Sequence, residues 1–265
     1  MYLNEIYIDD IVAEQIPKIR EDVIKKDKDK VLLVDGREGC GKSMFALQLA
    51  KGLDADFGIN KIAFNAQQFI KLIKSPERKK GDCIVLDEAF SAASSRRALS
   101  SVNQAMVAVA TEMRQVNLFV IIVLPSFFDL DRYFAIWRCD TLFHVYFDKN
   151  GDRGQYVLFP FHKKTTLYIE GKKTYNYNCV KSPYPPCKFL KKWAVDESEY
   201  RSLKAEAFKK RKLSIWEKKW KDRTSMLIRR LHDFYKETDE LIGQYLGLKQ
   251  QEIEMLRNND ENEQE

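Results

Sequence analysis

The sequence predicts an α/β protein in which a mainly parallel sheet lies between layers of helices. Short apolar runs of strand length alternate with helix-periodic segments along the first 150 residues, and these strands are apolar on both faces. Strands of that kind are typical of parallel sheets covered by helices on both sides. With 265 residues, 45% of them hydrophobic, the chain can form one substantial core and a smaller second one.

The alternation fixes the expected order of the elements. An N-terminal segment, residues 1–29, is expected to contribute a strand and a helix. The expected strand and helix pairs that follow are 30–35 with 43–53, 61–65 with 66–75, 83–88 with 103–115, and 118–126 with 129–137, before a last strand at 141–147. Right-handed crossovers place the loops after these strands along one edge of the sheet.

The first such loop reads GREGCGKS and matches the motif G-x-x-x-x-G-K-[ST] between a strand and a helix. Glycine permits positive φ angles and close backbone approach, and the helix N-terminus adds unpaired N–H donors, so the loop suits a phosphate. We expect Lys42 to reach the β- and γ-phosphates and the Ser43 hydroxyl to ligate Mg²⁺. The alternative, a glycine-rich turn that binds nothing, is disfavoured by the flanking elements. The predicted binding residues are Gly36, Arg37, Glu38, Gly39, Cys40, Gly41, Lys42, Ser43 and Met44.

A second motif, GDCIVLDEAF, is a short apolar strand that ends in an acidic pair. We expect Asp87 to hold Mg²⁺ through water and Glu88 to polarise an attacking water. The alternative is a strand that happens to end in two solvated acids. Small-molecule kinases generally lack the second acid, so the pair favours hydrolysis over transfer to a substrate.

These motifs resemble those of the RecA-like P-loop ATPases with a catalytic glutamate, and within them the HerA/FtsK group of DNA-pumping motors, including its Zot-like relatives. The resemblance covers roughly residues 31–147 and rests on GREGCGKS, IVLDEA and EMRQVNLFVIIVLPSFFDLDRYF. It implies a three-layer RecA-like sandwich, ATP and Mg²⁺ as cofactors, and a homo-oligomer such as a hexameric ring.

The resemblance also implies three further site positions. In that group an arginine precedes the fourth strand, and Arg114 fits this position. A glutamine is usual at the end of that strand, whereas here the strand runs into LPS, which leaves Ser126 as the polar candidate that senses the γ-phosphate. A further arginine reaches a neighbouring subunit's site, and both Arg132 and Arg138 remain candidates, although each alone is more often a surface arginine.

One stretch within this region and one after it need separate interpretation. The hydroxyl-rich segment 91–101 follows Glu88 directly and carries Arg96 and Arg97, which either report DNA or a neighbour to the catalytic acid or are solvated in a flexible loop. Beyond residue 147, DKNGDRG predicts a turn, and 155–161 and 165–171 are expected to form a β-hairpin that extends the sheet. Prolines at 183, 185 and 186 mark a boundary, so the expected domains are 1–29, 30–190 and 191–265.

The C-terminal region is basic and helical. Between Arg201 and Arg230 twelve Lys or Arg stand against three acidic residues. Segments 224–236, 238–247 and 249–257 are amphipathic, with Thr238 as an N-cap and Gly247 as a helix stop. This pattern is typical of a helix-turn-helix that reads DNA with residues 249–251, or of an ordinary helical subdomain for protein contacts. The DNA-binding interpretation is disfavoured by Glu252 and Glu254, whose negative charges would lie near the DNA phosphates.

Other features limit the location of the protein. No apolar run reaches the roughly 18 residues that a bilayer requires, and the N-terminus lacks a secretory pattern, so we expect a cytoplasmic protein without a membrane span. The 5 cysteines are scattered and odd in number, which favours reduced thiols, although Cys179 and Cys187 could pair in an oxidising or hot cytoplasm.

Two functions from different classes follow. The first is a ring-forming, Mg-ATP-hydrolysing motor that translocates or packages DNA. The second is an ATP-dependent switch or loader that docks a partner with slow turnover. A nucleotide kinase is disfavoured by Glu88 and by the lack of an arginine-rich lid.

Overall fold

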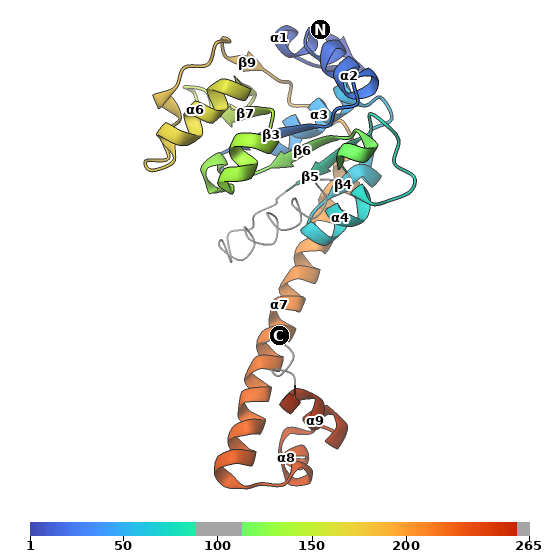
Figure 1. Cartoon of the computed structure of the whole chain (residues 1–265), viewed down its shortest axis with the longest axis vertical. Coiled ribbons are helices and arrows are strands. Elements are labelled where there is room, and N and C mark those ends of the chain that lie inside the picture. The colour runs from blue at the N-terminus through green and yellow to red at the C-terminus, as the bar shows by residue number, and fades with distance from the viewer. Residues whose placement is uncertain (88–112, 259–265) are drawn as a thin grey trace. The chain divides into compact units, whose positions relative to one another are not determined.

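The computed structural model describes residues 1–87 and 113–258 and divides into two compact units, Met1–Arg201 and Ser202–Glu265. Figure 1 shows the sheet in the first unit and a group of helices in the second. Three residues with predicted functional roles lie outside the described residues: Glu88, Arg96 and Arg97. Most of the predicted helix 103–115 lies outside them as well.

The first unit is built on a mainly parallel sheet, as predicted. In the described part of the chain the sheet has 7 strands in the order β4-β5-β6-β3-β7-β8-β9. The strands from β4 to β7 in that order run parallel, and β8 and β9 are antiparallel additions at one edge. The bounds are β3 Lys30–Gly36, β4 Ile62–Ala63, β5 Cys83–Leu86, β6 Phe119–Val123, β7 Thr141–Tyr146, β8 Gln155–Pro160 and β9 Cys187–Lys188.

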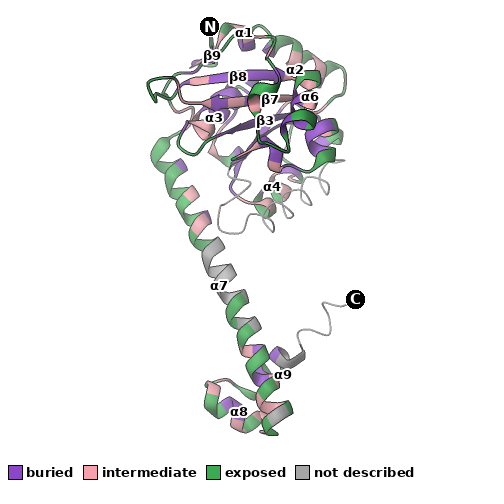
Figure 2. Cartoon of the chain, turned by 90° about the vertical axis from the view of Figure 1, so that its left-hand side faces the viewer, coloured by how far each residue is buried: buried purple, intermediate pink, exposed green. Residues whose placement is uncertain are grey.

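The central strands are buried on both faces, which Figure 2 shows for β3. On β3, Val31 and Leu33 belong to one hydrophobic cluster with residues of α4 and α6, whereas Leu32 and Val34 are equally buried but do not. Since successive side chains of a strand point to opposite faces, the sheet carries a core on each side. The helices of this unit are α1 Asp10–Ala13, α2 Ile16–Lys25, α3 Lys42–Leu53, α4 Ala66–Ile73 and α6 Phe161–Gly171.

The N-terminal segment packs on α3. It forms the antiparallel pair β1 (Tyr2–Leu3) and β2 (Ile6–Tyr7) before α1 and α2. A β-carbon added at Gly52 on α3 would lie 2.1 Å from the Cδ1 atom of Ile8, so the chain after β2 crosses close to the helix backbone.

The predicted β-hairpin of residues 155–161 and 165–171 does not form, although its first strand does extend the sheet. β7 pairs with β8 across the turn at 147–154, while residues 165–171, predicted as a strand, belong to α6. The buried positions 164, 167, 168 and 171 have helical spacing, and they pack the helix against the sheet. The hydroxyls of Thr165 and Thr166 donate to the carbonyls four residues earlier, which accommodates two β-branched residues in the helix.

The predicted helix at 129–137 is also replaced. The chain forms the short 3₁₀ helix η3 Phe127–Asp129 and then the π-helical turn η4 Phe134–Arg138. The buried ammonium of Lys164 on α6 donates hydrogen bonds to the carbonyl oxygens of Ala135 and Ile136. These bonds satisfy two carbonyls of η4 that an ordinary α-helix would pair internally.

The second unit contains most of α7 and two short helices, whereas the first turn of α7 belongs to the first unit. Its bounds are α7 Glu197–Tyr235, α8 Asp239–Leu246 and α9 Gln250–Asn258. Thr238 caps α8 by accepting a hydrogen bond from Leu241 N at 3.4 Å, and Gly247 ends it with φ +64°, as predicted. The hydrophobic core of the second unit consists of Ile228, Ile242, Ile253 and Leu256.

Among the helices formed by residues 1–87 and 113–258, none has the length and apolar character needed to span a lipid bilayer.

Candidate nucleotide-binding site

The loop between β3 and α3 has the backbone conformation that the motif predicts. Gly36, Gly39 and Gly41 have φ angles of +137°, +79° and +103°, which residues with a β-carbon rarely adopt. Gly41 is the N-cap of α3, so the unpaired N–H groups of the first helical turn face the loop. This geometry fits a phosphate group.

Lys42 lies across this loop. Its ammonium donates to the carbonyl oxygens of Gly36 at 2.7 Å and Arg37 at 2.8 Å. In the described part of the chain no carboxylate forms an ion pair with Lys42. The positive charge beside the loop is therefore available to an anion.

Ser43 and Asp87 meet beside the same loop. The Ser43 hydroxyl, in the first turn of α3, donates to Oδ1 of Asp87 at 3.0 Å. Asp87 follows β5, is fully buried, and its backbone N–H donates to Ala63 O at 2.8 Å, which extends the pairing with β4. A hydroxyl and a carboxylate beside a phosphate loop are the oxygen ligands that Mg²⁺ prefers. The two residues predicted to hold the metal are thus brought together.

Ser126 reaches the same edge of the sheet because β6 lies between β3 and β5. Its hydroxyl accepts a hydrogen bond from Phe128 N at 3.3 Å and lies 3.4 Å from the Tyr177 hydroxyl. Strand order predicts that the loop, Glu88 and Ser126 meet at one edge. The structure brings the loop and Ser126 there together with Asp87, whereas Glu88 itself lies outside the described residues.

Asp35, the residue before Gly36, organises a buried polar cluster that the sequence analysis missed. One carboxylate oxygen accepts hydrogen bonds from Phe127 N at 2.8 Å and from the Tyr177 hydroxyl, and the other lies 2.8 Å from His144 Nδ1. The rings of His144 and Tyr177 stack with centroids 3.9 Å apart. Burial, followed by the negative charge of Asp35, raises the pKa of Tyr177 above its ordinary value. An acid at the end of an otherwise apolar strand was the available signal.

Tyr200 is a second missed residue. Its hydroxyl, from the first turn of α7, donates to Oδ2 of Asp87. It lies 113 residues beyond its partner, and no motif or spacing pointed to it.

The predicted arginines do not gather at this site. Arg138 forms an ion pair with Asp29 at 2.8 Å, beside the start of β3, which is the edge opposite the loop. Arg114 is exposed and precedes the start of β6, at that same opposite edge. Arg132 is exposed on the connection between η3 and η4. None of the three contacts Ser43 or Asp87 of the same chain, and their catalytic roles stay predictions.

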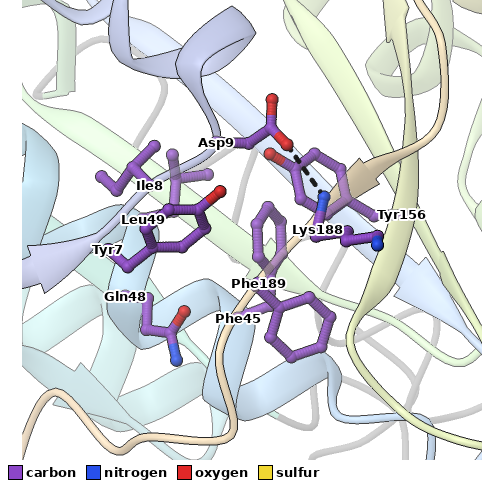
Figure 3. A pocket seen from close by; sticks show the side chains of 9 residues that line it. All are labelled: Tyr7, Ile8, Asp9, Phe45, Gln48, Leu49, Tyr156, Lys188 and Phe189. Carbon is purple, nitrogen blue, oxygen red and sulfur yellow. Dashed lines mark hydrogen bonds between the residues drawn. The ribbon is translucent and has the colours of Figure 1, made fainter. Parts of the chain in front are cut away.

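A small cavity behind the loop is lined by aromatic rings (Figure 3). A β-carbon at Gly41 would lie 3.0 Å from the ring of Phe189, so this packing supports the start of α3. Two buried polar atoms of the lining, Gln48 Oε1 and the Tyr156 hydroxyl, have no hydrogen-bond partner among the described residues. The lining residues are Tyr7, Ile8, Asp9, Phe45, Gln48, Leu49, Tyr156, Lys188 and Phe189.

Comparison with known proteins adds a distant likeness. No family model matches the sequence, and no curated protein matches it at a significant level. One similar solved structure is the N-terminal domain of zonular occludens toxin from Neisseria meningitidis, with 17% identity and a TM-score of 0.34, covering 51% of this chain and 85% of that chain. The fold assignment rests on the chain's own geometry: the strand order and the glycine loop give it a P-loop-like α/β fold.

Proposed function

We propose that the chain binds ATP with Mg²⁺ and hydrolyses it, and that hydrolysis moves or packages DNA in a ring of identical subunits. The observation that supports this most strongly is the hydrogen bond between Ser43 and Asp87 beside the glycine loop. This bond brings together the two side chains that are proposed to hold Mg²⁺, next to the backbone that is proposed to bind the phosphates.

Each residue then has a separate task. The loop N–H groups, the start of α3 and Lys42 would hold the phosphates, while Ser43 and Asp87 would hold Mg²⁺, whose charge neutralises the phosphate oxygens. Glu88 follows Asp87 directly in sequence and is proposed to polarise the attacking water. Ser126, at the neighbouring strand end, is proposed to sense the γ-phosphate.

Arg132 is the better candidate for the arginine that completes a neighbour's site. It is exposed and forms no ion pair within residues 1–87 and 113–258, whereas Arg138 is held by Asp29. An arginine that acts on another subunit has to reach beyond its own chain, which an exposed side chain can do. Arg114 remains a proposed catalytic residue, on the basis of the family resemblance alone.

The C-terminal unit is the proposed DNA contact. Lys249, which precedes α9, and Gln250 and Gln251 at the start of α9 are exposed, and α7 carries most of the basic residues of this unit. Phosphate contacts by such residues would give affinity that falls steeply with salt. Arg96 and Arg97 are proposed as a second contact.

An ATP-dependent switch or loader remains the second candidate. The bond between Tyr200 and Asp87 favours it, because it links the proposed metal site to the helix that continues into the second unit. A switch would turn over slowly, and DNA would not accelerate it.

The test measures steady-state ATP hydrolysis with and without double- and single-stranded DNA. Native mass measurement with a non-hydrolysable analogue accompanies it. Lys42→Ala should abolish nucleotide binding, Glu88→Gln should keep binding and lose turnover, and Lys71→Ala, which removes an exposed lysine from α4, should behave as wild type. Stimulation by DNA together with ring-sized mass supports the motor. Slow turnover that DNA leaves unchanged supports the switch, and wild-type turnover in Glu88→Gln refutes the assignment of the base.

A further inference from the structure

The first turn of α7 is firmly placed in the first unit. Asp196 caps the helix by accepting a hydrogen bond from Glu199 N at 2.8 Å, and Tyr200 N donates to Asp196 O at 3.0 Å. The backbone of Tyr200 is therefore fixed by an ordinary N-cap.

The side chain of Tyr200 is equally constrained. Only 2% of the residue is exposed, and its ring packs against Phe64 and Trp193, with centroids 5.6 and 5.0 Å away. Phe64 follows β4, the strand whose last carbonyl accepts the backbone N–H of Asp87. One strand end thus supports both the tyrosine ring and the aspartate.

The hydroxyl of Tyr200 and that of Ser43 contact different oxygens of the Asp87 carboxylate. Oδ1 of Asp87 accepts from Ser43, and Oδ2 accepts from Tyr200. Because each carboxylate oxygen has its own donor, the rotation of the carboxylate is fixed with Oδ1 turned toward the loop. A carboxylate free to rotate would lose part of its affinity for a metal, because ordering it costs entropy.

We propose that Tyr200 is a positioning residue for the magnesium site, and that it holds Asp87 in the orientation that binds the metal. This inference rests on the proposed function, since it assumes that Ser43 and Asp87 hold Mg²⁺. Hydrogen bonds from outside the ligand shell orient ligands, and their loss typically lowers metal affinity by about 10- to 100-fold. The coupling is reciprocal, so bound Mg²⁺ strengthens the contact between Tyr200 and Asp87 by the same factor.

The first experiment uses Tyr200→Phe, which removes the hydroxyl and keeps the ring. The affinity of a fluorescent ATP analogue is measured across a Mg²⁺ titration and again in EDTA. The variant should need about 10- to 100-fold more Mg²⁺ for half-maximal enhancement of binding, while its affinity in EDTA equals that of the wild type. Equal Mg²⁺ midpoints, or an equal loss of affinity with and without Mg²⁺, would overturn the inference.

Tyr168→Phe is the matched control. Tyr168 is also buried, and its hydroxyl donates to Leu130 O at 2.7 Å, away from Asp87. It should reduce thermal stability and leave the Mg²⁺ midpoint unchanged. A shift of the same size in this control would show that any buried hydroxyl has the effect, which also overturns the inference.

A second measurement needs no variant. Hydrogen exchange of the amides at 197–201 in the wild-type protein is compared between analogue with EDTA and analogue with Mg²⁺. Slower exchange with Mg²⁺ is expected at these amides and not in α8, and unchanged exchange overturns the coupling. Failure of the wild type to bind any nucleotide refutes the proposed function as well, whereas normal Mg²⁺-dependent binding with an unshifted Tyr200→Phe refutes this inference alone.

Discussion

The carbonyl oxygen of Val145 lies 2.0 Å from the position that a β-carbon on Gly36 would occupy. The two residues are paired across β3 and β7, and Gly36 has a φ angle of +137°. The loop therefore begins where the neighbouring strand leaves no room for a side chain.

Gly36→Ala should accordingly lower the free energy of unfolding by about 2–5 kcal/mol, the sum of backbone strain and overpacking. Urea unfolding followed by circular dichroism measures this change. Gly151→Ala is the control, because its φ is +80° but nothing lies within 4 Å of the added carbon, so only about 1–2 kcal/mol of strain is expected. Equal losses in the two variants would show that the contact with Val145 does not matter.

The buried ammonium of Lys61 bridges two acids, Asp54 at 2.7 Å and Asp82 at 2.9 Å. Lys61→Met leaves Asp54 buried without its cation and leaves Asp82 with only the more distant Arg78, at 3.7 Å, so it should cost about 3–5 kcal/mol of stability. Lys30→Met is the control, because its pair with Asp140 is partly exposed and should cost less than about 1 kcal/mol. Similar unfolding midpoints for the two variants would contradict the prediction.

The same cluster predicts an alkaline loss of stability. Burial lowers the pKa of Lys61, but the hydrogen bonds to Asp54 and Asp82 outweigh it, and the net pKa is raised. A cation whose pKa is raised by folding contributes fully below its unfolded-state pKa, and this contribution disappears as the pH rises through the folded-state value. Thermal unfolding between neutral and strongly alkaline pH should show a drop that is smaller in Lys61→Met; an equal drop would exclude Lys61 as its source.

Tyr177→Phe should destabilise the chain by about 1–3 kcal/mol, because it removes a hydrogen bond to the buried carboxylate of Asp35. Tyr175→Phe is its control, since that hydroxyl donates to Asp129 at 2.6 Å in an exposed position. There the loss should stay below about 1 kcal/mol because water replaces the bond. Guanidinium unfolding of both variants decides the point, and a larger loss in Tyr175→Phe would contradict it.

Arg132→Ala should bind ATP normally and hydrolyse it poorly, since an arginine finger acts chiefly in the transition state. Mixing this variant with Glu88→Gln should restore hydrolysis where an intact arginine meets an intact glutamate, if the ring tolerates inactive sites. Arg138→Ala, which loses the ion pair with Asp29, should lower stability and give no such complementation. Full ATPase activity of a monomer that binds DNA and nucleotide would leave no role for Arg132 in another subunit.

Much of the site followed from sequence because its residues belong to local patterns. Glycine spacing placed the loop, and an apolar strand ending in an acid placed Asp87, since strand order brings such ends to one edge. Thr238 and Gly247 were identified because helix ends depend on nearby backbone groups.

The errors and omissions arise from tertiary contacts. Residues 165–171 were predicted as a strand, but burial of Leu167 and Tyr168 against neighbouring elements favours a helix. Tyr177 and Tyr200 reach Asp35 and Asp87 from 142 and 113 residues away, and no periodicity records such a meeting. The ion pair of Arg138 with Asp29 likewise depends on the fold.

The distribution of the thiols makes the chain selectively labelable. All 5 cysteines are free, and Cys179 alone is exposed. Burial raises the pKa of the other thiols, to about 12 for Cys139 and Cys187, and thiolates are the reactive form. A maleimide dye would therefore attach at a single natural position, in the 3₁₀ turn η5 (Tyr177–Cys179), and in the proposed ring energy transfer between such dyes would report subunit spacing without an engineered cysteine.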